Sequence, residues 1–137
     1  MIGFEQARPD KTVCITLFNA EIGIFFSAES ADLYMHEVHG AEDSYFQDNF
    51  CKNTLAMAFA EGKNGHVDHI GMIFTSPPDG GLLAHECLHV VDYICDVVGI
   101  DLHMATMEPR AYMLHYLFDN VQEAVNEWME ENPGWSK

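Results

Sequence analysis

The stretch "LLAHECLHVVDYIC", residues 82–95, decides the fold of this chain. Its apolar residues recur at spacings of three and four, which is typical of an α-helix with one buried face. That face would carry Leu83, Cys87, Val90, Val91, Ile94 and Val98. The breaker sequence PPDGG precedes the stretch and Gly99 follows it, so we expect a capped core helix over residues 81–98.

Upstream of this helix, short runs rich in β-branched and aromatic residues predict a sheet. Residues 12–18 and 22–26 form two such runs, which we interpret as two strands or as one strand with a kink. The runs 54–61 and 66–76 flank the sequence GKNG and predict a β-hairpin.

Two further helices are expected. Ser27 or Ser30 can cap a helix that ends at Gly40, and residues 41–53 are expected to be loop with helical turns. Residues 106–131 form one long helix or two, with an apolar stripe made of Ala111, Leu114, Phe118, Val121, Val125 and Trp128. The pattern predicts an α+β fold in one small domain, residues 1–137. A short, mostly antiparallel sheet would pack on the 81–98 helix, and another helix would follow.

Composition limits the classes of function. With 48% hydrophobic residues among 137, the chain can bury a core. Its 22 acidic and 6 basic residues give a formal net charge of -16, which repels nucleic acids and anionic membranes. We therefore expect no nucleic-acid or membrane partner, and we expect any charge-steered substrate or partner to be basic.

Compartment is indicated by the cysteines and the N-terminus. The four cysteines form no CxxC pair, and the first eleven residues lack the features of a secretory signal. No apolar run reaches the roughly 18 residues of a membrane helix. These features predict a cytoplasmic protein with reduced thiols.

The polar residues of the central stretch have the spacing of a metal site. His85 and His89 are four residues apart, so on a helix both imidazoles can reach one ion. Glu86 would lie at their flank, where it can take a proton from water. This is the H-E-x-x-H arrangement of zinc hydrolases, and it predicts one catalytic Zn²⁺. The competing interpretation is an accidental pattern in a chain that has 8 histidines.

A third ligand is needed, because catalytic zinc sites use three protein ligands and leave one position open. Glu108 is the best candidate if the next helix packs antiparallel across the first, although an acid in a first helical turn also has a purely structural explanation. His103 and His115 remain alternatives. Cys95 would lie about 15 Å along the axis from His85, which is too far.

Residues 82–119 resemble the active-site half of gluzincin-type metallopeptidases, in which an H-E-x-x-H helix is followed by a helix that supplies a glutamate ligand. The hairpin, the motif helix and the sequence Glu108-Pro-Arg-Ala-Tyr112 are also similar to small zinc peptidases encoded by bacteriophages. The resemblance implies a zincin-like domain with His85, His89 and Glu108 as zinc ligands and Glu86 as general base. Tyr112, on the face of Glu108, would be a further catalytic residue that donates its hydroxyl to an oxyanion or to a ligand carboxylate.

Together these features predict a zinc-dependent peptide-bond hydrolase that acts on a peptide or protein substrate. For a phage-encoded protein, the compartment would be the host cytoplasm. Two alternatives remain open: a zinc-binding protein without catalysis, and an acidic interaction protein with an accidental motif. Glu86→Gln separates the first alternative from an enzyme, because it should abolish activity and leave the zinc content unchanged.

Overall fold

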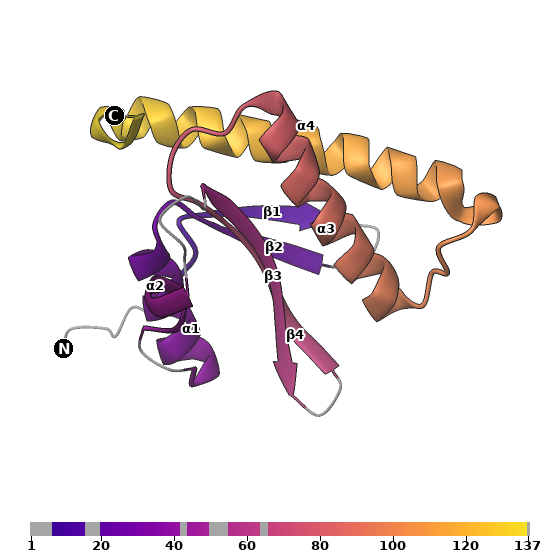
Figure 1. Ribbon diagram of the computed structural model, residues 1–137, viewed down its shortest axis with the longest axis horizontal. Helices are drawn as coiled ribbons and strands as arrows, with labels where there is room; N and C mark the ends of the chain where they lie inside the picture. Colours follow the sequence, from indigo (N-terminus) through magenta and orange to yellow (C-terminus); the bar gives the residue numbers. More distant parts are fainter. Residues whose placement is uncertain (1–6, 16–19, 42–43, 50–54, 64–65, 137) are drawn as a thin grey trace.

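The computed structural model describes residues 7–15, 20–41, 44–49, 55–63 and 66–136 (Figure 1). Along the chain the elements are β1 (Lys11–Ile15), β2 (Ala20–Phe25), α1 (Ala28–His39), α2 (Tyr45–Asn49), β3 (Ala56–Lys63), β4 (His66–Phe74), α3 (Gly80–Val98), η2 (Met104–Thr106), α4 (Met107–Glu131) and η3 (Pro133–Ser136). The helices α1 and α2 lie on one side of the sheet, and α3 and α4 lie on the other. The expected α+β class is confirmed.

The four strands are ordered β1-β2-β4-β3. β1 pairs with β2 and β3 pairs with β4 in antiparallel fashion, whereas β2 and β4 are parallel. The expected hairpin is therefore present as β3 and β4, although its turn residues 64 and 65 lie outside the described residues. The β2–β4 pairing places β4 inside the sheet and leaves β3 at one edge.

Each face of the sheet has its own core, because side chains alternate along a strand. Ile70, Met72 and Phe74 of β4 pack with α3 and α4, whereas Ile73 packs with α1 and α2. On the α1 side, Gly71 faces Phe59 on β3, and a Cβ at Gly71 would clash with the Phe59 ring. The absence of a side chain at Gly71 thus lets an aromatic ring of the edge strand cover the central strand.

α3 has the predicted caps. The Asp79 side chain accepts a hydrogen bond of 2.7 Å from the Leu82 backbone N–H, and Gly99 ends the helix with φ 78°. The predicted apolar face is buried with one exception: Val98, in the last turn, is 39% exposed.

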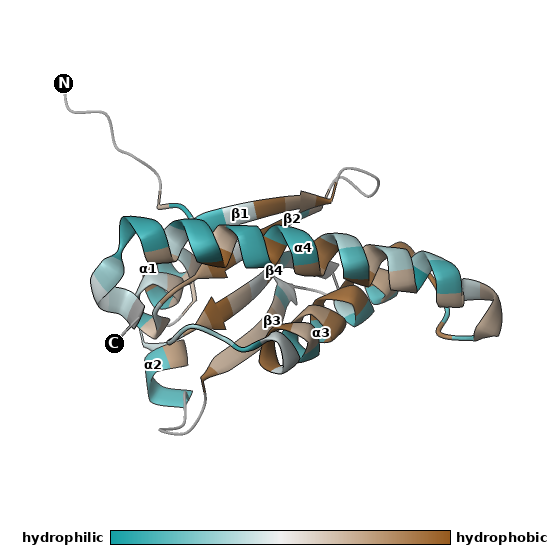
Figure 2. Cartoon of the chain, turned by 90° about the horizontal axis from the view of Figure 1, so that it is seen from above, coloured by the Kyte–Doolittle hydropathy of each residue, from teal (hydrophilic) through white to brown (hydrophobic). Residues whose placement is uncertain are grey.

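α4 is one uninterrupted helix, and its most buried face is rotated from the predicted stripe, with Val121 and Val125 common to both. The buried residues are Met113, Leu117, Val121, Ala124 and Val125. Ala111, which was expected in the stripe, is exposed, and Leu114, Phe118 and Trp128 are partly buried. The first turns extend beyond the sheet, so they meet few apolar partners (Figure 1). Figure 2 shows α4 with alternating hydrophilic and hydrophobic bands, as expected of a helix that buries one face.

Residues 41–53 contain α2, which is held by a buried carboxylate of α1. Asp32, 1% exposed, accepts hydrogen bonds from the Phe46 backbone N–H at 2.7 Å and from the Gln47 backbone N–H at 3.0 Å. A short helix with unsatisfied N–H groups is thereby capped from another element. Within the described part of the chain, no helix combines the length and apolar character needed to cross a membrane.

Candidate metal centre

His85 and His89 lie side by side on α3, as the four-residue spacing predicts. Their Nε2 atoms are 3.2 Å apart, and the ring centroids are 4.8 Å apart. Two nitrogens bound to one tetrahedral zinc at 2.0 to 2.1 Å would be separated by about 3.3 Å. The spacing also permits a hydrogen bond between the rings when one nitrogen is protonated. Both side chains are exposed, so an ion or a ligand can reach the pair from solvent.

Glu86 lies beside the pair but is turned inward. Glu86 is 6% exposed, and its Oε1 is 4.0 Å from the Nε2 of His85. Tyr93 is seven residues further along and therefore lies on nearly the same line of the helix. Its hydroxyl is 3.5 Å from the carbonyl oxygen of Ala58 on β3. The Glu86 carboxylate thus lies on the flank of α3 that faces the edge strand.

Cys87, inside the motif, packs in the core as expected. Its residue is fully buried. Burial raises the pKa of its thiol to about 12, with a further contribution from the negative charge of Glu86. Cys87 is therefore a neutral apolar side chain at physiological pH, and neither a nucleophile nor a thiolate ligand.

The structure does not bring the expected third ligand to the histidine pair. Across the described ranges, no three His, Cys, Asp or Glu side chains gather in a group that could hold a metal ion. Glu108 is exposed in the first turn of α4, which follows the C-terminal end of α3. His89 lies nine residues before that end, about 14 Å along the axis. Antiparallel packing therefore places Glu108 near the wrong end of α3.

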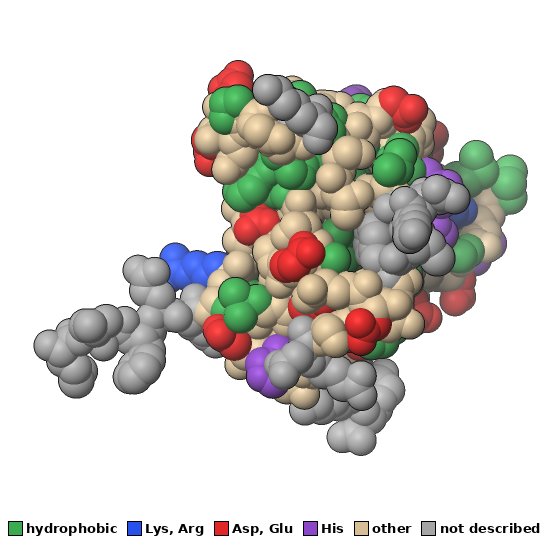
Figure 3. Space-filling model, turned by 60° about the vertical axis from the view of Figure 1, so that its left-hand side comes forward, with side chains coloured by type: hydrophobic (Ala, Val, Ile, Leu, Met, Phe, Trp, Pro, Cys, Tyr) green, Lys and Arg blue, Asp and Glu red, His purple; other side chains and the backbone are tan. Residues whose placement is uncertain are grey.

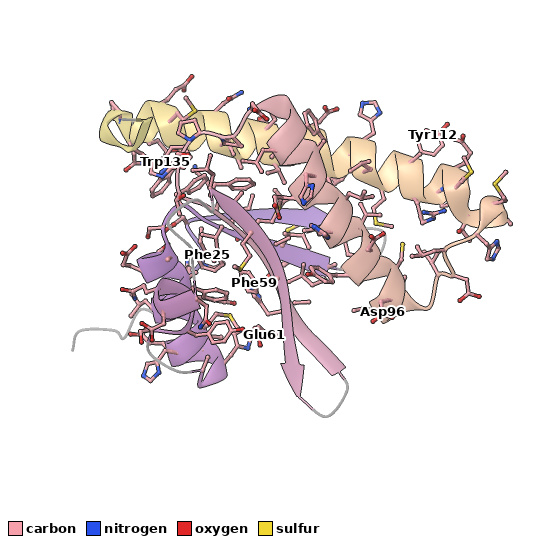
Figure 4. All side chains as sticks on the ribbon, in the orientation of Figure 1. Phe25, Phe59, Glu61, Asp96, Tyr112 and Trp135 are labelled. Carbon is pink, nitrogen blue, oxygen red and sulfur yellow. The ribbon has the colours of Figure 1, made fainter. Side chains whose placement is uncertain are left out.

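The remaining candidates have other surroundings. His103 caps η2, where its Nδ1 accepts a hydrogen bond of 3.2 Å from the Ala105 backbone N–H. His115 faces Asp119 at 3.2 Å. Cys95 is buried. Tyr112 is 70% exposed on α4 (Figure 4). The structure therefore brings together His85, Glu86 and His89 but not Glu108 or Tyr112.

Comparison with known proteins gives one short match. No family model and no solved structure matches the chain. The inactivation-no-after-potential D protein of Drosophila melanogaster is 31% identical over 72 residues, which cover 53% of this chain and 10% of that protein. The chain thus spans about a tenth of the length of this relative, a share too small to assign it to the same family.

Proposed function

We propose that the chain is a zinc-dependent peptide-bond hydrolase whose reaction is centred on His85, Glu86 and His89. The observation that carries this proposal is the 3.2 Å spacing of two exposed imidazole nitrogens beside an inward-turned carboxylate. His85 and His89 would hold the ion, and the first turn of α4 would have to move toward this pair for Glu108 to become the proposed third ligand. A bound zinc ion supplies Lewis-acid chemistry, which acidifies water and polarises a carbonyl group.

Glu86 would perform the proton transfers. Its carboxylate takes a proton from water as the water oxygen adds to the carbonyl carbon of the peptide. When the carbon–nitrogen bond breaks, Glu86 returns that proton to the leaving amine, so atoms and charge balance. The partly apolar flank of α3 keeps this carboxylate away from bulk water, which strengthens its interaction with a nearby cation.

In this proposal, β3 aligns the substrate peptide. β4 has no free edge for strand addition where it pairs with β2 over residues 70–73 and with β3 on its other side. β3 lies at the edge of the sheet and contacts α3 through Tyr93. An extended peptide added along β3 would pass the Glu86 flank. The net charge of -16 favours basic peptides.

A zinc-binding protein without catalysis is the second candidate. It is favoured by the absence of a three-ligand group among the residues that the structure describes. A site of two histidines would retain metal weakly, whereas a peptidase needs a third ligand and an open position.

The experiment measures metal content and peptide cleavage on the same preparations. The parent, Glu86→Gln, Glu108→Ala and Glu123→Ala are purified without chelator or affinity-tag metal; Glu123 is an exposed acid on the same helix as Glu108. We expect near-stoichiometric zinc in the parent, Glu86→Gln and Glu123→Ala, and at least about tenfold weaker binding in Glu108→Ala.

Cleavage is then assayed with matched basic and acidic peptides at low and high salt. The proposal requires activity in the parent that Glu86→Gln abolishes, with basic peptides preferred at low salt. Zinc binding without cleavage of any peptide would support the second candidate. No zinc uptake by the folded parent would exclude both.

A further inference from the structure

A second pair of histidines meets on the opposite side of the sheet. His69 projects from β4 toward α1, and His39 is the last residue of α1; their ring centroids are 5.2 Å apart. Tyr34 adjoins both rings, with centroid distances of 5.0 Å to His69 and 5.5 Å to His39.

Both imidazoles carry an unsatisfied nitrogen. The Nε2 atoms of His39 and His69 are buried and have no hydrogen-bond partner in the part of the chain that the structure describes. His69 is 9% exposed, so its nitrogen is also largely withdrawn from bulk water. Buried polar atoms are almost always paired, and two unpaired ones in adjacent rings indicate a ligand.

The neighbouring strand leaves room for the His69 ring. A Cβ at Gly23 on β2 would lie 3.0 Å from Cε1 and 3.1 Å from Nε2 of His69. These distances are tighter than ordinary contacts, and the Cγ of Pro9 lies equally close at 3.0 Å, so a side chain at this position would press on both the His69 ring and Pro9. Gly23 therefore forms part of a cradle that holds Nε2 in place.

The surroundings favour a cation. A pocket of about 530 Å³ is lined by Met35, Val38, His39, Gly40, Ala41, Glu61 and Gly62. Glu61 lines this pocket together with the C-terminal end of α1, where the helix dipole is negative, and His69 adjoins it through its contact with His39. Figure 3 shows acidic side chains spread over this side of the molecule. Burial, with a contribution from His39, lowers the pKa of His69 to about 4, so its ring is neutral at physiological pH.

We propose that His39 and His69 bind a divalent transition-metal ion, such as Zn²⁺ or Cu²⁺, through their Nε2 atoms. Neutral imidazole is a preferred ligand of these ions. No third His, Cys, Asp or Glu joins the pair among the described residues, so the Tyr34 hydroxyl or water completes the coordination. The site is separate from His85 and His89, because the sheet lies between the two pairs.

The test starts from the full chain with His85→Ala and His89→Ala, free of tag and metal. This double variant is titrated with Cu²⁺ alone and with Zn²⁺ alone, and the bound ion is measured by equilibrium dialysis, because two imidazoles retain an ion weakly. We expect one equivalent of ion to bind, with nitrogen couplings from two imidazoles in the Cu²⁺ electron paramagnetic resonance spectrum. This background is independent of the proposed peptidase, so the two proposals can fail separately.

Two further substitutions locate the ion. His39→Gln, added to the double variant, should abolish binding of the one equivalent of ion. Gly23→Ala should weaken that binding by displacing His69. His36→Gln is the matched control, because His36 lies on the same helix and its Nδ1 contacts the carbonyl oxygen of Ala41 at 2.8 Å. Circular dichroism verifies the fold of each variant. Absence of binding to the folded double variant, or binding that survives His39→Gln, would overturn the proposal.

Discussion

Cys14 and Cys87 differ in exposure, and burial raises the pKa of Cys87, which provides a residue-level test of the packing of α3. Cys14 is exposed on β1, whereas Cys87 is fully buried and its pKa is raised to about 12. Because the thiolate is the reactive form, a raised pKa suppresses alkylation at pH 8. We predict that iodoacetamide labels Cys14 in the native protein and spares Cys87 until urea unfolds the chain. Peptide mapping by mass spectrometry gives the rates, and equal native rates would contradict the burial of the motif helix.

At the level of the element, the two ends of α3 respond oppositely to the same substitution. Gly99 has φ 78°, where a side chain is strained, whereas nothing lies within 4 Å of a Cβ at Gly80 in the first turn. Gly99→Ala should lower the free energy of unfolding by about 1 kcal/mol, and Gly80→Ala should raise it by about 0.5 kcal/mol. Urea denaturation of both variants measures the difference. Equal effects would show that Gly99 does not end the helix in the left-handed conformation.

The same helix explains which elements could be predicted. In α3 the apolar period and the signals at both helix ends agree, because PPDGG precedes the apolar face and Gly99 follows it. The bounds of this helix therefore follow from the local sequence. α4 has a clear apolar period, but no residue near Ala111 signals where the buried face of the helix begins. Its buried face depends on where α3 and the sheet lie, which is a tertiary property. The sequence therefore predicts the length of α4 more closely than its orientation.

The candidate site divides in the same way. His85, Glu86 and His89 are neighbours through one turn of helix, so their spacing alone brings them together. Glu108 depends on how two helices cross, and its exposed position in α4 had no local signal. The pairing of His39 with His69 required the parallel β2–β4 ladder and the return of α1 over the sheet. Contacts between distant segments were therefore the part that sequence patterns missed.

For the molecule as a whole, the charge of -16 is opposed by few cations within the described structure. One of them, Lys11 on β1, lies 2.7 Å from Glu131 and 3.3 Å from Glu127 on α4. The hydrogen bond with Glu131 is the main reason why the pKa of Lys11 is raised. A raised lysine pKa contributes stability that is fully present below the usual value of 10.5 and is lost as pH rises through the higher folded value. Such exposed pairs contribute about 0.5 kcal/mol each, which cannot offset repulsion across the whole surface.

Salt should therefore stabilise the protein. Raising NaCl from low ionic strength to about 0.5 M shortens the range of repulsion to a few ångströms, and we predict that Tm rises by several degrees. Lys11→Gln should lower Tm at low salt and show a larger gain on adding salt, because it increases the net charge and removes pairs that salt would weaken. Differential scanning calorimetry of both proteins across a NaCl series at pH 7 measures these shifts. A Tm that falls with NaCl in the parent would mean that ion pairs, and not repulsion among its carboxylates, dominate the electrostatic free energy of this fold.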